Sequence, residues 1–113
     1  MPKIKIKIVI QNSNETIENT TMGIYSQGVL KYLEEEKTKV TYHYKNHQLL
    51  RENDEYKMTF DFEKGNLKTK LKEYQTELNI EIKNIIIKED NKNIIIEYEI
   101  DKERFIYRIE EVI

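Results

Sequence analysis

Hydrophobic and polar residues alternate along most of the chain, with the period of two that is typical of β-strands. In residues 3–10, isoleucine occupies every second position, and lysine or valine fills the positions between. A strand of this kind places its isoleucines on one face of a sheet and its lysines on the other. The pattern therefore predicts strands with one face in a core and the other in water.

Turn-forming residues divide the alternating segments into eight to ten strands. The predicted strands are 3–10, 16–26, 29–35, 38–44, 47–52, 56–62, 77–88, 93–100 and 104–112. The links between them are short and rich in Asn, Asp and Gly, which are turn residues. Short links favour antiparallel neighbours, so we expect one all-β domain over residues 1–113, an antiparallel meander of eight to ten strands that is closed into a barrel or folded into a sandwich.

The phase of the strands predicts which side chains form the inner face of this barrel. We expect it to include Ile4, Ile6, Ile8, Tyr56, Met58, Phe60, Ile94, Ile96, Tyr98 and Ile100. A register slip of one residue would expose all of them at once, so their burial tests the prediction. Gly23 falls inside a predicted strand and indicates a bulge or a barrel corner.

Residues 67–78 fit two interpretations. Leu67, Leu71, Tyr74 and Leu78 have the 4-3-4 spacing of a helical stripe, in a segment of good helix formers. As a strand, the same segment places Leu67 and Leu71 on the inner face and its lysines outside. The spacing alone favours the helix slightly.

The composition favours sheet and restricts the space inside it. Eighteen residues are isoleucine, none is alanine, and 30 are Ile, Val or Thr, whose β-branched side chains suit strands. A barrel of about eight strands is just wide enough to be filled by side chains. We therefore expect a mostly filled interior with a small pocket at one end, too small for a long-chain lipid.

The charge balance and the missing residue types argue against several classes of function. Nineteen basic residues face 21 acidic ones, and the net charge of −2 gives no reason to expect binding to nucleic acid or to an anionic membrane. Apolar runs do not exceed three residues, so we expect no membrane span or signal peptide. Without cysteine there is no thiol chemistry. We expect a cytoplasmic protein without a cofactor.

Candidate catalytic and metal-binding residues are few. Serine occurs only at Ser13 and Ser26, without a nucleophile elbow. The three glutamates at 34–36 are more typical of a solvated acidic turn than of a catalytic carboxylate pair. His43 and His47 could face each other across a hairpin, but zinc needs further ligands that the spacing does not place. We expect neither an enzyme nor a metal site.

Several short motifs are similar, in order and spacing, to those of a known family. They are Gly23-Ile24-Tyr25, Tyr32-Leu33-Glu34-Glu35, Lys39-Val40, Leu50-Arg51 followed by Lys57-Met58-Thr59-Phe60, and Tyr74-Gln75-Thr76. In these motifs, over nearly the whole chain, the sequence resembles the YwiB-like proteins, small uncharacterised bacterial proteins with a calycin-like barrel related in shape to lipocalins. The resemblance implies such a barrel, with residues 68–74 as strand, and implies no activity. The chain departs from the family at Asn53, in place of Gly, and at 77–79, in place of a Pro-aromatic-Gly turn.

Arg51 is the residue that most directly suggests a ligand site. It shares strand phase with Leu49, which predicts that an arginine enters the barrel and must be paired or bind an anion. A structural arginine, bonded to tyrosine hydroxyls or to a carboxylate, is favoured over an anion clamp. Tyrosines suit a pocket because each has an apolar body and a polar tip. We expect the pocket to be lined by some of Tyr25, Tyr32, Tyr42, Tyr44, Arg51 and Tyr98.

The sequence therefore supports two hypotheses. The leading one is a non-enzymatic barrel that binds a small, partly apolar or anionic ligand. The alternative is a structural or protein-interaction barrel with a filled core and no ligand. The runs 85–87 and 94–96 break the alternation, which places Ile86 and Ile95 close together on the outer face. Such an apolar spot suits a protein partner or a homodimer.

Overall fold

The structure is a computed structural model that describes residues 3–35, 37–90 and 93–112, and all regular elements of these residues are strands. The strands are β1 (Lys3–Gln11), β2 (Thr16–Ser26), β3 (Val29–Glu34), β4 (Thr38–His43), β5 (Gln48–Glu52), β6 (Tyr56–Asp61), β7 (Asn66–Leu71), β8 (Thr76–Glu81), β9 (Lys83–Asp90), β10 (Asn93–Ile100) and β11 (Glu103–Glu111). They form one sheet in the order β8-β7-β6-β5-β4-β3-β2-β1-β11-β10-β9, and its paired strands are antiparallel.

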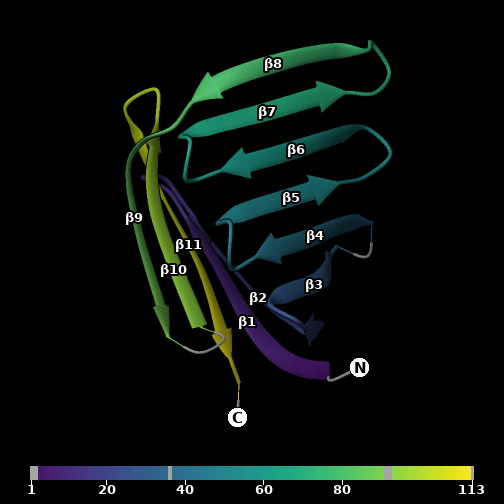
Figure 1. The fold of residues 1–113 in the computed structure, drawn as a ribbon, viewed down its shortest axis with the longest axis vertical. Helices are drawn as coiled ribbons and strands as arrows, with labels where there is room; N and C mark the ends of the chain where they lie inside the picture. The colour runs from purple at the N-terminus through teal and green to yellow at the C-terminus, as the bar shows by residue number, and fades with distance from the viewer. Residues whose placement is uncertain (1–2, 36, 91–92, 113) are drawn as a thin grey trace.

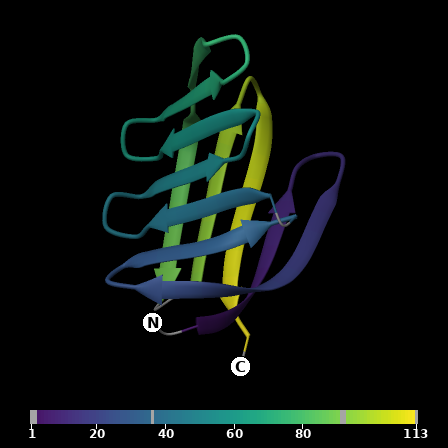
Figure 2. The same ribbon diagram turned by 90° about the vertical axis from the view of Figure 1, so that its right-hand side faces the viewer.

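The sheet folds over on itself into a nearly closed barrel (Figure 1). Strands β3 to β8 form one wall, and β9, β10, β11 and β1 form the other and run at a steep angle to them. Strand β2 joins the two walls (Figure 2), because it pairs with β1 over residues 16–24 and with β3 over residues 24–26. The predicted all-β antiparallel barrel is confirmed, with eleven strands where eight to ten were expected.

The additional strands come from residues 67–88. The helical stripe in 67–78 does not form a helix: β7 ends at Leu71, residues 72–75 turn, and β8 follows. The strand implied at 68–74 is therefore confirmed only as far as Leu71. The single strand predicted at 77–88 is wrong, because the chain bends at Ile82, which is buried and whose N–H donates to the carbonyl of Gly65. Asn84, just beyond it, has a φ of 52°.

The predicted inner face is confirmed. Seven of its ten residues are buried and three are half-buried. The buried ones are Ile4, Ile6, Ile8, Phe60, Ile94, Ile96 and Tyr98; the half-buried ones are Tyr56, Met58 and Ile100. Burying a large apolar side chain contributes about 1.5–3 kcal/mol, so this face is the main source of stability.

Gly23 lies where β2 passes from one wall to the other, as a barrel corner would require. A Cβ atom at this position would come within 3.0 Å of Leu30 Cδ1 and 3.2 Å of Ile6 Cδ1. Leu30 and Ile6 are both fully buried. A larger residue would therefore push two core side chains apart at the bend.

Strands β8 and β9 form the two edges of the sheet. At the start of β9, Gly65 approaches Ile82 so closely that a Cβ on Gly65 would lie 2.9 Å from the Ile82 carbonyl oxygen, and this contact continues the β7–β8 ladder by one residue pair. Further along, Glu89 contacts His47 of the β4–β5 turn. The β4–β5 turn therefore reaches β9 through this side-chain contact near the end of the strand.

Candidate ligand cleft

A cleft of about 360 Å³ lies between the β1–β2 hairpin and the end of β3. It is lined by Ile8, Ile10, Ile17, Glu18, Asn19, Glu34, Glu35 and Arg51. The three isoleucines supply an apolar surface because they lie on paired strands with the same phase, Ile10 opposite Ile17 and Ile8 opposite Asn19. Ligand pockets are typically 300–1,000 Å³ and mostly apolar with a few polar groups, and this cleft falls in that class.

Arg51 enters the cleft from β5. It is opposite Val40 of β4, which is 1% exposed, so its strand position faces the interior as predicted. Its Nη2 atom donates to Oε1 of Glu34 in an ion pair whose two side chains are both about four-fifths buried. Burial lowers the pKa of Arg51, but the Glu34 carboxylate and three nearby tyrosines, Tyr32, Tyr107 and Tyr56, together raise it by more, so the pKa lies above its ordinary value. The arginine is therefore held in its charged form by a partner within the protein.

This ion pair leaves two polar atoms without partners. Within the described residues, Arg51 Nε and Glu34 Oε2 are closed to solvent and form no hydrogen bond. Leaving a buried donor or acceptor unsatisfied costs about 1–3 kcal/mol. A group that both donates and accepts hydrogen bonds would lower that cost if it reached the pair.

Tyr32 and Tyr107 form a second buried pair, near the first. Their hydroxyl groups are hydrogen-bonded to each other, which links β3 in one wall to β11 in the other. Burial raises the pKa of both hydroxyls, so both stay protonated at neutral pH. This pair is a cross-barrel bond between the two walls.

Tyr25, Tyr42 and Tyr44 gather elsewhere in the barrel. The ring of Tyr44 packs edge-on against Tyr25 and Tyr42, with centroids 5.7 and 4.9 Å away. The Tyr42 hydroxyl donates to Oε1 of Glu89 at 3.3 Å. Burial raises the pKa of Tyr42, and the nearby Glu89 charge raises it further. This group fastens β4 to β9.

Tyr98 belongs to a third group, a row of aromatic rings in the core. Its ring stacks on Phe105 with centroids 5.4 Å apart and lies 5.3 Å from Phe62 and 6.0 Å from Phe60. Burial raises the pKa of Tyr98 to about 12. The six predicted pocket residues thus lie in separate places, and of these six Arg51 alone is among the described residues that line the cleft.

The histidines do not converge on a common point. His43 is opposite Gln48 rather than His47. His47 contacts Oε1 of Glu63 through Nδ1 at 3.2 Å and Oε1 of Glu89 through Nε2 at 3.1 Å, on opposite sides of its ring. In the described part of the chain, no group of three or more His, Cys, Asp or Glu side chains is arranged to hold a metal ion.

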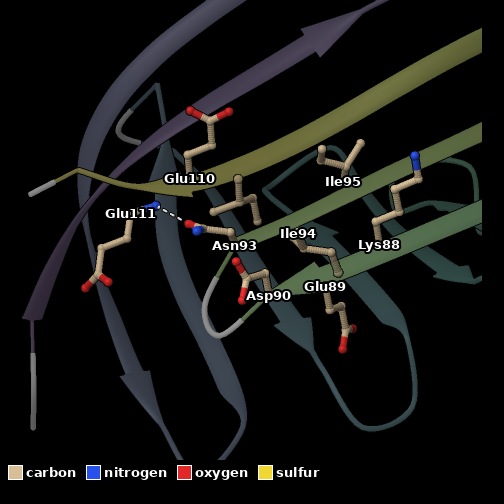
Figure 3. Close-up of a pocket in the computed structure, with 9 residues that line it drawn as sticks. Lys88, Glu89, Asp90, Asn93, Ile94, Ile95, Glu110 and Glu111 are labelled. Atoms are coloured by element: carbon tan, nitrogen blue, oxygen red, sulfur yellow. Dashed lines mark hydrogen bonds between the residues drawn. The ribbon is translucent and has the colours of Figure 1, made fainter.

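A second depression, of about 300 Å³, lies at the end of the β9–β10 hairpin beside β11. Four of its residues are acidic, but Figure 3 shows the carboxylate of Glu110 pointing away from those of Glu89 and Asp90. The Asn93 side chain is already engaged, since its Oδ1 accepts from the N–H of Glu111 at 2.8 Å. Diverging carboxylates do not form a common binding point, so we do not regard this depression as the site.

Ile86 and Ile95 both lie on the outer face. The register places Ile86 opposite Glu97 and Ile95 opposite Lys88, so the two isoleucines are diagonal neighbours rather than a direct pair. Ile86 is 44% exposed and Ile95 is half-buried.

Sequence reasoning did not identify Glu34, Ile10 or Ile17 as site residues. The interpretation of residues 34–36 as a solvated turn is wrong for Glu34, whose side chain is only 21% exposed, while Glu36 lies outside the described residues. The registers of the two hairpins would have identified Glu34. Tyr32, Val40 and Arg51 lie side by side on neighbouring strands, and Glu34 is the next residue after Tyr32 on the same face of β3. For the isoleucines the alternation gave the face but not the cleft.

Comparisons of the chain with protein-family models, with curated proteins and with solved structures found no match. The described residues contain no helix of the length and hydrophobicity needed to cross a membrane.

Proposed function

We propose that the protein is a non-enzymatic β-barrel that binds a small, partly apolar ligand in the cleft beside Arg51. The observation that carries this proposal is that one cleft of about 360 Å³ combines three isoleucines with the Arg51–Glu34 ion pair. The core of the barrel is packed with side chains, so the ligand lies at this cleft and not along the barrel axis. Its apolar part contacts the isoleucines, and its polar part approaches the ion pair.

The charges in the cleft favour a neutral polar head group. Three carboxylates, Glu18, Glu34 and Glu35, outnumber the single cation, Arg51. An anionic head group would first have to displace Glu34 from Arg51. A hydroxyl or a primary amide both donates and accepts hydrogen bonds, so it offers a donor to the Glu34 carboxylate and an acceptor to the Arg51 guanidinium at once.

A calycin- or lipocalin-like relationship, as the resemblance to the YwiB-like proteins implies, is part of the proposal and agrees with a ligand site on a β-barrel. So is a cytoplasmic location, which the cysteine-free composition supports.

The decisive experiment compares two equally exposed residues of β2. Ile17 lines the cleft and is 52% exposed, whereas Met22 is 53% exposed and does not line it. We expect the wild type to bind an apolar fluorescent dye, Ile17→Lys to weaken binding by about tenfold or more, and Met22→Lys to leave it unchanged. Native mass spectrometry of the purified protein would look for a retained ligand.

Equal loss of dye binding in both variants would place the dye outside the cleft and contradict the proposal. A wild type that binds no apolar probe would favour the alternative, a structural or protein-interaction barrel. The filled core and the exposed Ile86 are the observations that support that alternative.

A further inference from the structure

Strand β8 ends the sheet with an uncovered edge. In the described residues its only ladder partner is β7, and Figure 1 shows it as the outermost strand of its wall. The first four residues of β8 are exposed, and Leu78 is 49% exposed. Strand β8 packs beside β7 and pairs with no other strand of the described residues. It also lacks the lysine or proline that commonly protects an edge.

The two faces of β8 differ in chemistry. Ile80 is opposite Leu67, which is buried, so Ile80 and Leu78 lie on the inner face. The outer face carries Glu77, Asn79 and Glu81. A strand added to this edge would therefore place apolar side chains inside and meet carboxylates outside.

The strand already paired with β8 shows which partner suits these faces. Strand β7 has lysines on its outer face and a leucine at each end of its inner face. One of these lysines, Lys70, is opposite Glu77. Lys68 Nζ lies 3.8 Å from Glu77 Oε1. The free edge of β8 presents the same alternation of apolar and acidic positions on its other side.

A cavity lies beside the last residues of β8. Its volume is about 630 Å³, and it lies between the end of β8, the start of β9 and the β10–β11 turn. Ile80 and Ile100 give it apolar surface, and Glu81, Glu99 and Asp101 outnumber its two lysines. A basic and apolar segment would therefore fit the cavity better than an acidic one.

We propose that β8 is a docking edge for an extended peptide segment in which apolar and basic residues alternate, and which adds to the sheet as a further strand. Its backbone pairs with the free edge, its apolar residues extend the inner row of Leu78 and Ile80, and its lysines or arginines meet Glu77 and Glu81. A second copy of β8 is a poorer occupant, because it would add two more carboxylates to an acidic face.

The test uses a peptide with the sequence of residues 64–73, which contains β7, and its counterpart with glutamate in place of the three lysines at 68, 70 and 72. Both are titrated into the full ¹⁵N-labelled chain, to about 1 mM. We expect the lysine peptide to shift amide signals in Thr76–Glu81 and to slow their hydrogen exchange, and added salt to weaken its binding. We expect the glutamate peptide to leave them unchanged.

Charge-reversal variants define the site. Glu77→Lys with Glu81→Lys should weaken the lysine peptide by about tenfold and allow the glutamate peptide to bind, while the control pair Glu15→Lys with Glu110→Lys, which changes the net charge equally elsewhere, should do neither. Leu78→Ser, which removes the exposed inner leucine, should also weaken binding. Equal binding of both peptides, shifts confined to β9, or no change in β8 would overturn the proposal, whether or not the cleft beside Arg51 binds a dye.

Discussion

At the scale of single residues, the Arg51–Glu34 pair determines the chemistry of the candidate cleft. An arginine on the inner face of a barrel must be compensated, and here a carboxylate two strands away compensates it. The structural interpretation of Arg51, as an arginine bonded to a carboxylate, therefore describes the protein without a ligand. Whether the arginine can also bind an anion depends on whether Glu34 can be displaced.

Glu34→Gln tests this dependence. The substitution removes the competing charge and keeps the shape of the side chain, so Arg51 becomes available to an external carboxylate. We expect the wild type to bind a short-chain fatty amide at least as well as the matching carboxylate, and Glu34→Gln to bind the carboxylate about tenfold better than the wild type does. Isothermal titration calorimetry with both compounds measures the two affinities.

The double variant Glu34→Gln with Arg51→Met serves as the control, and it should lose the gain while still binding the apolar dye. A wild type that strongly prefers the carboxylate would show that Glu34 gives way to a ligand, against the neutral head group proposed here.

The buried tyrosines predict a loss of stability in alkali. The pKa of Tyr98 is raised from its ordinary value of 10.0 to about 12 by burial, and burial raises those of Tyr32, Tyr42, Tyr44 and Tyr107 as well. Between pH 10 and pH 12 the unfolded chain loses these protons while the folded chain keeps them, so stability falls as pH rises.

Urea unfolding at several pH values measures this slope. Tyr98→Phe should make the slope of the unfolding free energy against pH shallower by the contribution of about one proton, because the variant lacks one hydroxyl with a raised pKa. Tyr74→Phe is the matched control, since Tyr74 is 72% exposed and should leave the slope unchanged. An unchanged slope in Tyr98→Phe would contradict the prediction.

At the scale of elements, three of the turns between strands are built by the same side-chain device. Oδ1 of Asn12, of Asn53 and of Asp61 each accepts two backbone N–H groups, from the residues two and three positions later, at 2.9–3.1 Å. Asn53 also donates through Nδ2 to Thr38. These hydrogen bonds explain why asparagine occupies position 53, where the YwiB-like proteins have glycine.

Asn53→Ala should therefore destabilise the fold by about 1–2 kcal/mol, because two N–H groups and the partly buried Thr38 contact lose their partner. Asn53→Asp keeps the acceptor and should recover most of the loss. Chemical denaturation of the three proteins gives the values, and an alanine variant as stable as the wild type would show that water replaces the side chain fully.

The contact between Gly65 and Ile82 continues the β7–β8 ladder into the bend before β9. Gly65 has φ +69°, and an added Cβ would lie 2.9 Å from the Ile82 carbonyl oxygen. Gly28 has φ +76° with nothing within 4 Å of an added Cβ, so Gly28→Ala incurs only the backbone cost, about 1–2 kcal/mol. We expect Gly65→Ala to cost about 1–3 kcal/mol more than Gly28→Ala in urea unfolding. Equal losses would show that Ile82 shifts freely.

The alternation of the sequence predicted most of the elements but not the bend at Ile82. A period-two pattern states which face a residue occupies, and here it changes phase after Ile82, because Lys83 and Asn84 are both polar and the next isoleucine is Ile85. The positive φ of Asn84 lies at this change of phase, but the pattern alone does not state whether the chain bends there or continues as one irregular strand. Residues 67–78 were ambiguous for the related reason that a short stripe fits both periods.

At the scale of the whole molecule, the predicted site shows a second limit of sequence reasoning. The alternation predicted that the six candidate residues face inward, but gave no position along the barrel axis. The tyrosines are consequently divided among a cross-barrel pair, a group beside Glu89 and an aromatic row. Which tyrosines meet depends on the register of every strand pair between them. The length of each turn sets one of these registers, so an error of one residue in a single turn would bring different side chains together.

The apolar spot formed by Ile86 and Ile95 on the outer surface predicts self-association. Ile86 and Ile95 are diagonal neighbours on the outer face, between Lys88 and Glu97, so a two-fold copy could place apolar against apolar and Lys88 against Glu97. We expect a weak dimer whose population increases with protein concentration.

Ile86→Lys should abolish this dimer without changing the fold, because the Ile86 side chain is 44% exposed, and Ile95→Lys should act in the same way. Met22→Lys, at an exposed residue of β2, which is four strands from β9 in the sheet, should leave the dimer intact. Light scattering against concentration measures the mass, with circular dichroism as the check on folding. A wild type that stays monomeric at high concentration would remove the homodimer from consideration and leave the β8 edge as the remaining proposed protein contact.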